Sequence, residues 1–197
     1  MPNLLLLSGG IDSAALAAWQ PPSSTLFIDY GQRPAAGEAV AASVIAQNLG
    51  LLHSSIRIDC SQIGSGMLAA SEPVSVAPSA EWWPYRNQLL ITMAAAWAIP
   101  RGFDTITLGA VASDSFHMDG KPDFFHAIDA LLRIQEGSLR VSAPAITMTS
   151  VQLVKTSGIS MGVLGWTISC HRGAESCGDC PGCNKHAGVL NDLRSKA

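Results

Sequence analysis

The hexapeptide Ser8-Gly9-Gly10-Ile11-Asp12-Ser13 has the residue types and spacing of a loop that binds phosphate. An apolar run precedes it and an alanine-rich stretch follows, a pattern that predicts strand, tight turn and helix. The glycines let the backbone approach a ligand closely, and free N–H groups at a helix start favour an anion. The serines add hydroxyl donors, and Asp12 could hold Mg²⁺. We therefore expect a nucleotide-phosphate site; the alternative is a turn that merely connects a strand to a helix.

Four of the five cysteines lie close together near the end of the chain, at Cys170, Cys177, Cys180 and Cys183. This spacing is typical of a zinc site with four thiolate ligands, and four thiolates close the coordination sphere of a structural ion. A redox pair and an iron–sulfur cluster are the alternatives. The isolated Cys60 is expected to be a small core or loop residue.

Strand and helix patterns alternate along the chain, which predicts an α/β fold with a parallel five-stranded sheet flanked by helices. The expected strands are residues 4–7, 25–28, 55–58, 105–109 and 141–143, and the expected helices after the first are 38–49, 86–99 and 123–135. The helix over 86–99 is nearly all apolar and is therefore expected to be buried. Residues 61–81 are rich in Ser, Gly and Pro and predict a flexible loop long enough to be a substrate lid.

Polar clusters follow the ends of these expected strands. Residues 29–33 follow the second strand, Arg86 and Asn87 open the third helix, and Asp114 follows the fourth strand. Because ligands gather at the carboxyl ends of parallel strands, these clusters are expected to lie near the hexapeptide. Each could instead be a helix cap or a solvated loop.

Composition limits the classes of function. The 197 residues include 48% apolar and 14% charged residues, with a net charge of −3 and a pI near 5.9. This balance gives no drive toward nucleic acid, and the longest apolar stretch, 89–99, is too short to span a bilayer. We expect a soluble cytoplasmic protein without a membrane partner. The low charge leaves neutral surface that favours a homo-oligomer, taken to be a dimer; the alternative is that it reflects only an alanine-rich composition.

The hexapeptide lacks the Lys-Ser/Thr ending of the common P-loop and resembles the SGGxDS loop of the ATP pyrophosphatases. Three further motifs follow in order: DYGQR at 29–33, P-x-R-N at 84–87, and SC…CGxCxxC over 169–183. The ordered set resembles the 7-cyano-7-deazaguanine synthase (QueC) family almost end to end. The resemblance implies an adenine nucleotide alpha hydrolase-like (HUP/PP-loop) domain over residues 1–165 and a zinc-binding segment over 166–197 packed on it.

The resemblance also implies an activity and the residues that carry it. Family members use ATP to adenylate 7-carboxy-7-deazaguanine, let ammonia form the amide, and dehydrate that amide to the nitrile with a second ATP. ATP, Mg²⁺ and Zn²⁺ are the expected cofactors. Catalytic roles are expected for Asp12, Arg86 and Asp114. Nucleotide binding is expected for Ser8, Gly9, Gly10, Asp12, Ser13, Asp29, Tyr30, Arg33 and Asn87.

This chain departs from the family pattern mainly on the expected acceptor side. The departures are Pro34, Ser115, Gly120, Lys121, Asp123, Ser150, Gln152 and His186. Ser150 replaces a family lysine, so a phosphate-facing cation is expected to be missing there, with Lys155 nearby in the sequence.

These changes keep two alternatives to the nitrile-forming synthase open. One is a relative from antiphage defence that joins the activated deazaguanine carboxylate to an amine of a partner protein. The other is a catalytically silent nucleotide-binding scaffold. A relative that modifies tRNA is disfavoured because the chain is acidic.

Overall fold

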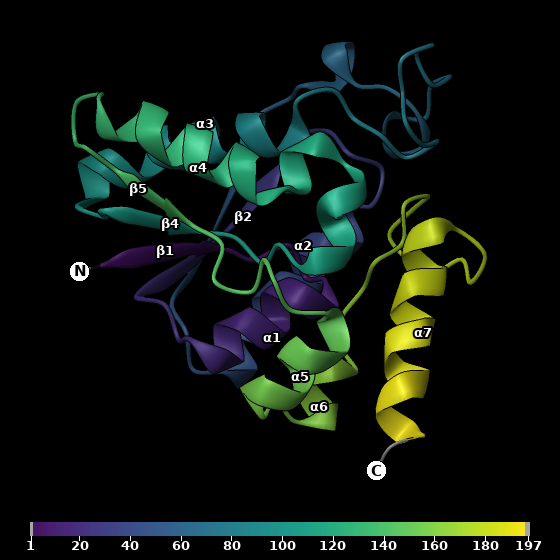
Figure 1. Ribbon diagram of the computed structural model, residues 1–197. Helices are drawn as coiled ribbons and strands as arrows, with labels where there is room; N and C mark the ends of the chain where they lie inside the picture. The colour runs from purple at the N-terminus through teal and green to yellow at the C-terminus, as the bar shows by residue number, and fades with distance from the viewer. Residues whose placement is uncertain (1, 196–197) are drawn as a thin grey trace.

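The protein is built on one parallel sheet, seen in the computed structural model, which describes residues 2–195 (Figure 1). The sheet order is β3-β2-β1-β4-β5, and each neighbouring pair is parallel. The strands are β1 (Asn3–Leu6), β2 (Ser24–Asp29), β3 (His53–Arg57), β4 (Thr105–Thr107) and β5 (Arg140–Ser142). The predicted α/β class with five parallel strands is confirmed. The chain winds outward in both directions from β1, so the switch point lies between β1 and β4, where such sheets bind ligands.

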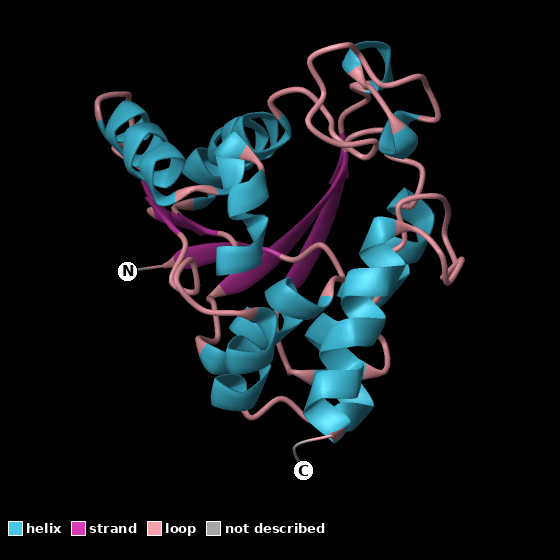
Figure 2. Ribbon diagram, turned by 45° about the vertical axis from the view of Figure 1, so that its right-hand side comes forward, coloured by secondary structure: helices cyan, strands magenta, loops and turns pink. Residues whose placement is uncertain are grey.

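Helices cover both faces of the sheet (Figures 1 and 2). The helices are α1 (Ile11–Trp19), α2 (Ala35–Asn48), α3 (Arg86–Ala98), α4 (Pro122–Arg133), α5 (Ser150–Ser157), α6 (Met161–Leu164) and α7 (Pro181–Arg194). Successive side chains along each strand point to opposite faces of the sheet, so the core consists of two clusters, one on each face. Leu5 and Phe27 pack with α1, α2, α5, α6 and α7, whereas Leu4 and Leu26 pack with α3 and α4. Within residues 2–195, no helix is long and apolar enough to cross a membrane.

The expectation that helix α3 is buried is wrong. Its buried side chains are Ile91, Ala94 and Ala98, which recur at helical spacing and form one stripe against the sheet. Thr92 on another face is exposed. The sequence misleads here because alanine is apolar yet small enough to stand on an outer helix face at little cost.

The long connection between β3 and α3 is anchored at both ends and exposed in its middle. It contains the short 3₁₀ turns Ser61–Ile63 and Met67–Ala69. Leu68 and Trp83 are buried, and the backbone N–H of Arg33 donates to Leu68 O at 2.8 Å. Residues 70–76 between these anchors are exposed. If this loop acts as a substrate lid, the part that moves would be its exposed middle, residues 70–76; this role stays a prediction.

Candidate nucleotide site and four-cysteine cluster

A cavity of about 460 Å³ opens at the carboxyl ends of β1, β2 and β4. It brings together most of the residues that the sequence pointed to, although they come from four separate stretches of the chain. The predicted residues that line it are Ser8, Gly10, Asp12, Ser13, Tyr30, Arg86, Asn87 and Asp114. Gly9, Asp29 and Arg33 are not among its lining residues.

The loop between β1 and α1 is held in shape by its own serines. The hydroxyls of Ser8 and Ser13 lie 3.1 Å apart, and Ser13 Oγ donates to Gly10 O at 3.0 Å. The first intrahelical bond runs from Ala14 N to Gly10 O at 3.1 Å. The N–H groups before it, at residues 11–13, have no earlier helical turn to bond to, which is the arrangement that favours an anion.

Gly9 shapes this loop through packing and not through the cavity. Its φ of +79° lies in the left-handed region, where a side chain is strained. A Cβ there would lie 2.8 Å from Glu38 O and 2.9 Å from the Cβ of Ala41, both on α2. We therefore place Gly9 as the residue that lets α2 approach the loop, which differs from the expected ligand contact.

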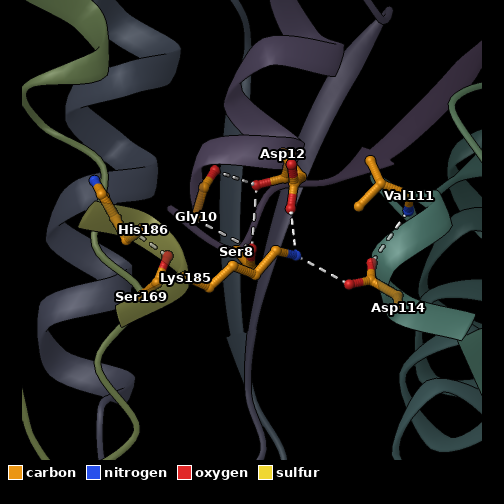
Figure 3. Close-up of polar contacts among 9 residues, drawn as sticks. Ser8, Gly10, Asp12, Val111, Asp114, Ser169, Lys185 and His186 are labelled. Atoms are coloured by element: carbon orange, nitrogen blue, oxygen red, sulfur yellow. Dashed lines mark hydrogen bonds and ion pairs between the residues drawn. The ribbon is translucent and has the colours of Figure 1, made fainter. Parts of the chain in front are cut away.

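Three charged side chains meet in front of the loop (Figure 3). Lys185 Nζ lies 3.0 Å from Asp12 Oδ2 and 3.0 Å from Asp114 Oδ1. The other oxygen of Asp114 accepts the N–H of Val111 at 3.1 Å, which fixes the carboxylate at the end of β4. The other oxygen of Asp12 is buried and accepts no hydrogen bond from any residue between 2 and 195. Convergent carboxylate oxygens of this kind fit a divalent cation such as Mg²⁺.

A second polar group lies deeper in the cavity, around Tyr30 and Glu38. Gln32 links them, because its Oε1 accepts Tyr30 N and its Nε2 donates to Glu38 Oε2, each at 2.8 Å. Burial raises the pKa of Glu38 to about 7, against the effects of Gln32 and Arg86. Burial also raises the pKa of Tyr30 well above its ordinary value. Although burial opposes it, the surrounding phenol and carboxylates raise the pKa of Arg86, so its guanidinium stays charged.

Asn87 is committed to the loop that follows β4. Its Nδ2 donates to Asp119 O at 2.8 Å, and its backbone N–H donates to Asp119 Oδ2 at 3.2 Å. Nearby, His117 Nε2 lies 3.9 Å from Glu81 Oε1, and both side chains line the cavity. These contacts tie the start of α3 and the residues before it to residues 117–119 of the loop that follows β4.

Asp29 and Arg33 face away from this arrangement. Asp29 accepts the N–H of Gly31 at 3.0 Å and pairs with Arg57 at 3.6 Å. Arg33 is exposed. Strand β2 ends at Asp29, so alternation separates Asp29 from Tyr30 only, and Arg33 lies beyond the turn at Gly31. Their predicted role in nucleotide binding has no support from this geometry.

The four cysteines form the cluster that their spacing predicts. Their sulfur atoms lie within 4.8 Å of one another, and those of Cys177 and Cys183 are 3.9 Å apart. Tetrahedral Zn–S bonds of about 2.3 Å would place the sulfurs about 3.8 Å apart. The donor set and its spacing therefore fit zinc.

Hydrogen bonds support the thiolate form of Cys180 and Cys183. The N–H groups of His171 and Cys183 point at Cys180 Sγ, at 3.3 and 3.4 Å. Although burial opposes it, the hydroxyl of Ser176 and nearby backbone N–H groups lower the pKa of Cys183 to about 6. Donors aimed at the ligating sulfurs are the supporting contacts expected around such a site. Cys60 is remote from the cluster in sequence and packs against the α3 side of the core.

Comparison with known proteins gives one consistent result. The model of the family described as "Queuosine biosynthesis protein QueC" matches residues 3–193. The chain is 35% identical to a 7-cyano-7-deazaguanine synthase of Acidobacterium capsulatum, over 91% of this chain and 87% of that protein. It is 30% identical to synthases of that name from Xanthomonas campestris pv. campestris, over 96% and 92% of the two chains, and from Pseudomonas aeruginosa, over 93% and 91%.

The chain belongs to the QueC family. Its fold is accordingly of the PP-loop type. Against the QueC pattern, Ser150 is buried and its hydroxyl contacts no polar partner within the described residues, and Lys155 is exposed outside the cavity lining. A lysine does line the cavity, but it comes from elsewhere in the chain, at Lys185 on α7.

Sequence reasoning missed Lys185 and Glu38. Lys185 lies two residues after the last cysteine of the QueC signature, and this position was a usable signal. Cysteines that bind one metal fix the direction of the helix that begins among them, here α7. His186 follows it into the cavity wall, where its Nδ1 lies 3.3 Å from Ser169 Oγ. Glu38 gave no signal, because an acidic residue near a helix start is ordinarily a solvated one.

Proposed function

We propose that this protein activates the carboxylate of 7-carboxy-7-deazaguanine with ATP and transfers the acyl group to ammonia, as in the formation of 7-cyano-7-deazaguanine. One observation carries the proposal: a single cavity joins the loop 8–13 to the charged side chain of Arg86 and to the acceptor loop at 116–120. Residues suited to both halves of an activation-and-transfer reaction therefore line one cavity. The names of the relatives support the same substrate.

In the activation step, a carboxylate oxygen of the substrate attacks the α-phosphorus of ATP. The bond to the β-phosphate breaks, pyrophosphate leaves, and an acyl adenylate remains. The N–H groups of residues 11–13 and the hydroxyls of Ser8 and Ser13 would bind phosphate oxygens. Asp12 and Asp114 would hold Mg²⁺, which supplies charge neutralisation for the phosphates when bound. Arg86 would orient the substrate carboxylate through its fixed guanidinium fork.

In the transfer step, an amine attacks the acyl carbon, AMP leaves, and the amine gives up a proton. The pair formed by His117 and Glu81 lines the cavity beside the acceptor loop and would accept that proton. A second adenylation, at the oxygen of the amide, would then allow loss of that oxygen with AMP to give the nitrile. The reaction would also need water kept from the acyl carbon, because water would otherwise hydrolyse the adenylate.

One observation favours a second acceptor, an amine of a partner protein. Phe116 lines the cavity and is 65% exposed, and Met118 in the same loop is 73% exposed. Ammonia needs no apolar surface at the entrance, whereas an extended peptide end would bury these side chains. In this version, the adenylate forms in the same way and one amide bond to the partner is the final product.

Product mass decides between these acceptors. The purified protein is incubated with ATP, Mg²⁺, the deazaguanine acid and ammonia, and the small molecules are identified by mass spectrometry. We expect the nitrile, with two ATP converted to AMP and pyrophosphate for each product. A product that stops at the adenylate or amide, yet couples to a protein amine, supports the second acceptor. If no pyrophosphate exchanges into ATP, the protein is a nucleotide-binding scaffold and the proposal is wrong.

A further inference from the structure

Lys185 occupies the position of a cation between two carboxylates. Its Nζ is 3.0 Å from an oxygen of Asp12 and 3.0 Å from an oxygen of Asp114, residues that lie 173 and 71 positions away in the sequence (Figure 3). The two carboxylates carry two negative charges, and the ammonium supplies one positive charge between them. The buried second oxygen of Asp12, which accepts no hydrogen bond from any described residue, leaves further acceptor capacity at the same point.

The same two carboxylates are the oxygens that a nucleotide-bound Mg²⁺ would take. Magnesium binds through one or two carboxylates together with phosphate oxygens and water. An ammonium and a divalent ion cannot both lie against the same carboxylate oxygens without strong repulsion. Lys185 must therefore leave at least one aspartate when the nucleotide enters, and its flexible four-carbon stem allows this movement.

The backbone from which Lys185 extends is fixed by the cysteine cluster. Helix α7 begins one residue after Cys180, and Cys183 lies two residues before Lys185. Cys183 N donates to Cys180 Sγ at 3.4 Å, so the first turn of α7 is part of the knuckle. Gly182 in that turn has His171 Nε2 2.6 Å from where its Cβ would lie, so α7 is packed tightly here. Only the side chain of Lys185 is free to change direction.

We propose that Lys185 is an exchangeable cation of the nucleotide site, which joins Asp12 to Asp114 in the unliganded protein and moves to a phosphate oxygen of Mg²⁺·ATP when the metal takes the carboxylates. This inference rests on the proposed use of ATP. It assigns to α7 a direct part in nucleotide binding, in addition to its place in the cysteine knuckle. No bond is made or broken in this exchange; one ion pair replaces another.

Two binding measurements on Lys185→Met test the exchange, with Lys155→Met as the matched control. Lys155 is an exposed lysine outside the cavity lining. Equilibrium dialysis with labelled Mg²⁺·ATP should show binding about tenfold weaker, or more, in Lys185→Met, because a charge-assisted contact to phosphate is lost. Electron paramagnetic resonance with Mn²⁺ alone should show tighter metal binding in the same variant, because the competing ammonium is gone.

The two opposite shifts together identify the exchange. A merely structural lysine would weaken both ligands or neither, so either pattern overturns the inference. Thermal unfolding and zinc content show that the variant is folded, and Lys185→Gln takes its place if it is not. Failure of the proposed function gives a different result. If the wild-type protein binds Mg²⁺·ATP but makes no product from the deazaguanine acid, the proposed substrate is wrong, and the binding measurements still test the role of Lys185. Wild type that does not bind Mg²⁺·ATP overturns both.

Discussion

The ring of Tyr30 meets the ring of Trp83 edge to face, with their centroids 4.9 Å apart. This contact joins the residue after β2 to the residue three positions before Arg86, and so holds two walls of the cavity together. Trp83 is 1% exposed, and a Cβ on Gly64 would lie 2.7 Å from its ring. The long loop before α3 is thus packed where it borders the site.

We expect Trp83→Ala to destabilise the protein by about 3–5 kcal/mol, because removing a fully buried aromatic ring leaves a cavity. Chemical denaturation with equilibrium analysis measures this loss. The matched control is Trp166→Ala, since Trp166 is 53% exposed and its loss should change stability by less than about 1 kcal/mol. Equal losses in the two variants would show that the loop is not anchored through Trp83.

Glu38→Gln should change how stability depends on pH. Burial raises the pKa of Glu38 to about 7, above the ordinary value of 4.5. The folded protein then holds a proton that the unfolded chain releases, so wild-type stability falls as pH rises from about 4.5 to 7. Glutamine keeps an acceptor for Gln32 and has no proton to lose. The variant should therefore gain up to about 3 kcal/mol over wild type at pH 8 relative to pH 5.

Denaturation curves of both proteins at several pH values provide the measurement for Glu38. Glu72→Gln, on the exposed middle of the long loop, is the control and should follow wild type. Parallel pH profiles for wild type and Glu38→Gln would contradict the raised pKa.

Asp12→Asn should abolish exchange of labelled pyrophosphate into ATP while leaving thermal unfolding nearly unchanged. The amide keeps the shape of the side chain and loses the charge that Mg²⁺ and Lys185 require. Asp192→Asn, on the exposed part of α7, is the matched control and should exchange at the wild-type rate. Exchange that survives in Asp12→Asn would remove Asp12 from the metal site.

Cys180→Ser should remove the metal and free α7. Metal analysis should find one zinc in wild type and in Cys60→Ser, and none in Cys180→Ser. Because metal binding in such knuckles is largely folding energy, amide hydrogen exchange should rise over residues 170–194. Mg²⁺·ATP binding should weaken as well, because the backbone at Lys185 would no longer be held in place by the cysteine cluster. Slow exchange over 170–194 in a metal-free variant would show that the knuckle folds by itself.

Local patterns in the sequence were enough to predict the five strands, the loop at 8–13 and the cysteine cluster. Each depends on residues within a few positions of one another: an apolar run, a pair of glycines at a strand end, and thiols three or seven positions apart. These patterns can be recognised without knowing the rest of the fold, because each one constrains the backbone only over neighbouring residues.

Helix α7 and the exposure of α3 were not predicted for the opposite reason. Helix α7 carries few apolar residues, and packing of Val189 against the α1 side of the core stabilises it. Helix α3 is apolar at most of its positions, although Gln88 and Thr92 are exposed, and the sheet beneath it decides which stripe is buried.

The sequence by itself determined the family, the order of the five strands and of helices α1 to α4, and the residue types able to bind phosphate and metal. Only the tertiary structure decided which of them meet. It turned Asp29 and Arg33 away from the cavity, gave Gly9 a packing role, and brought Lys185 to Asp12 across 173 positions. The reason is that motif spacing fixes backbone shape over a few residues, whereas contacts between distant side chains depend on how strands and helices pack, which no short pattern encodes.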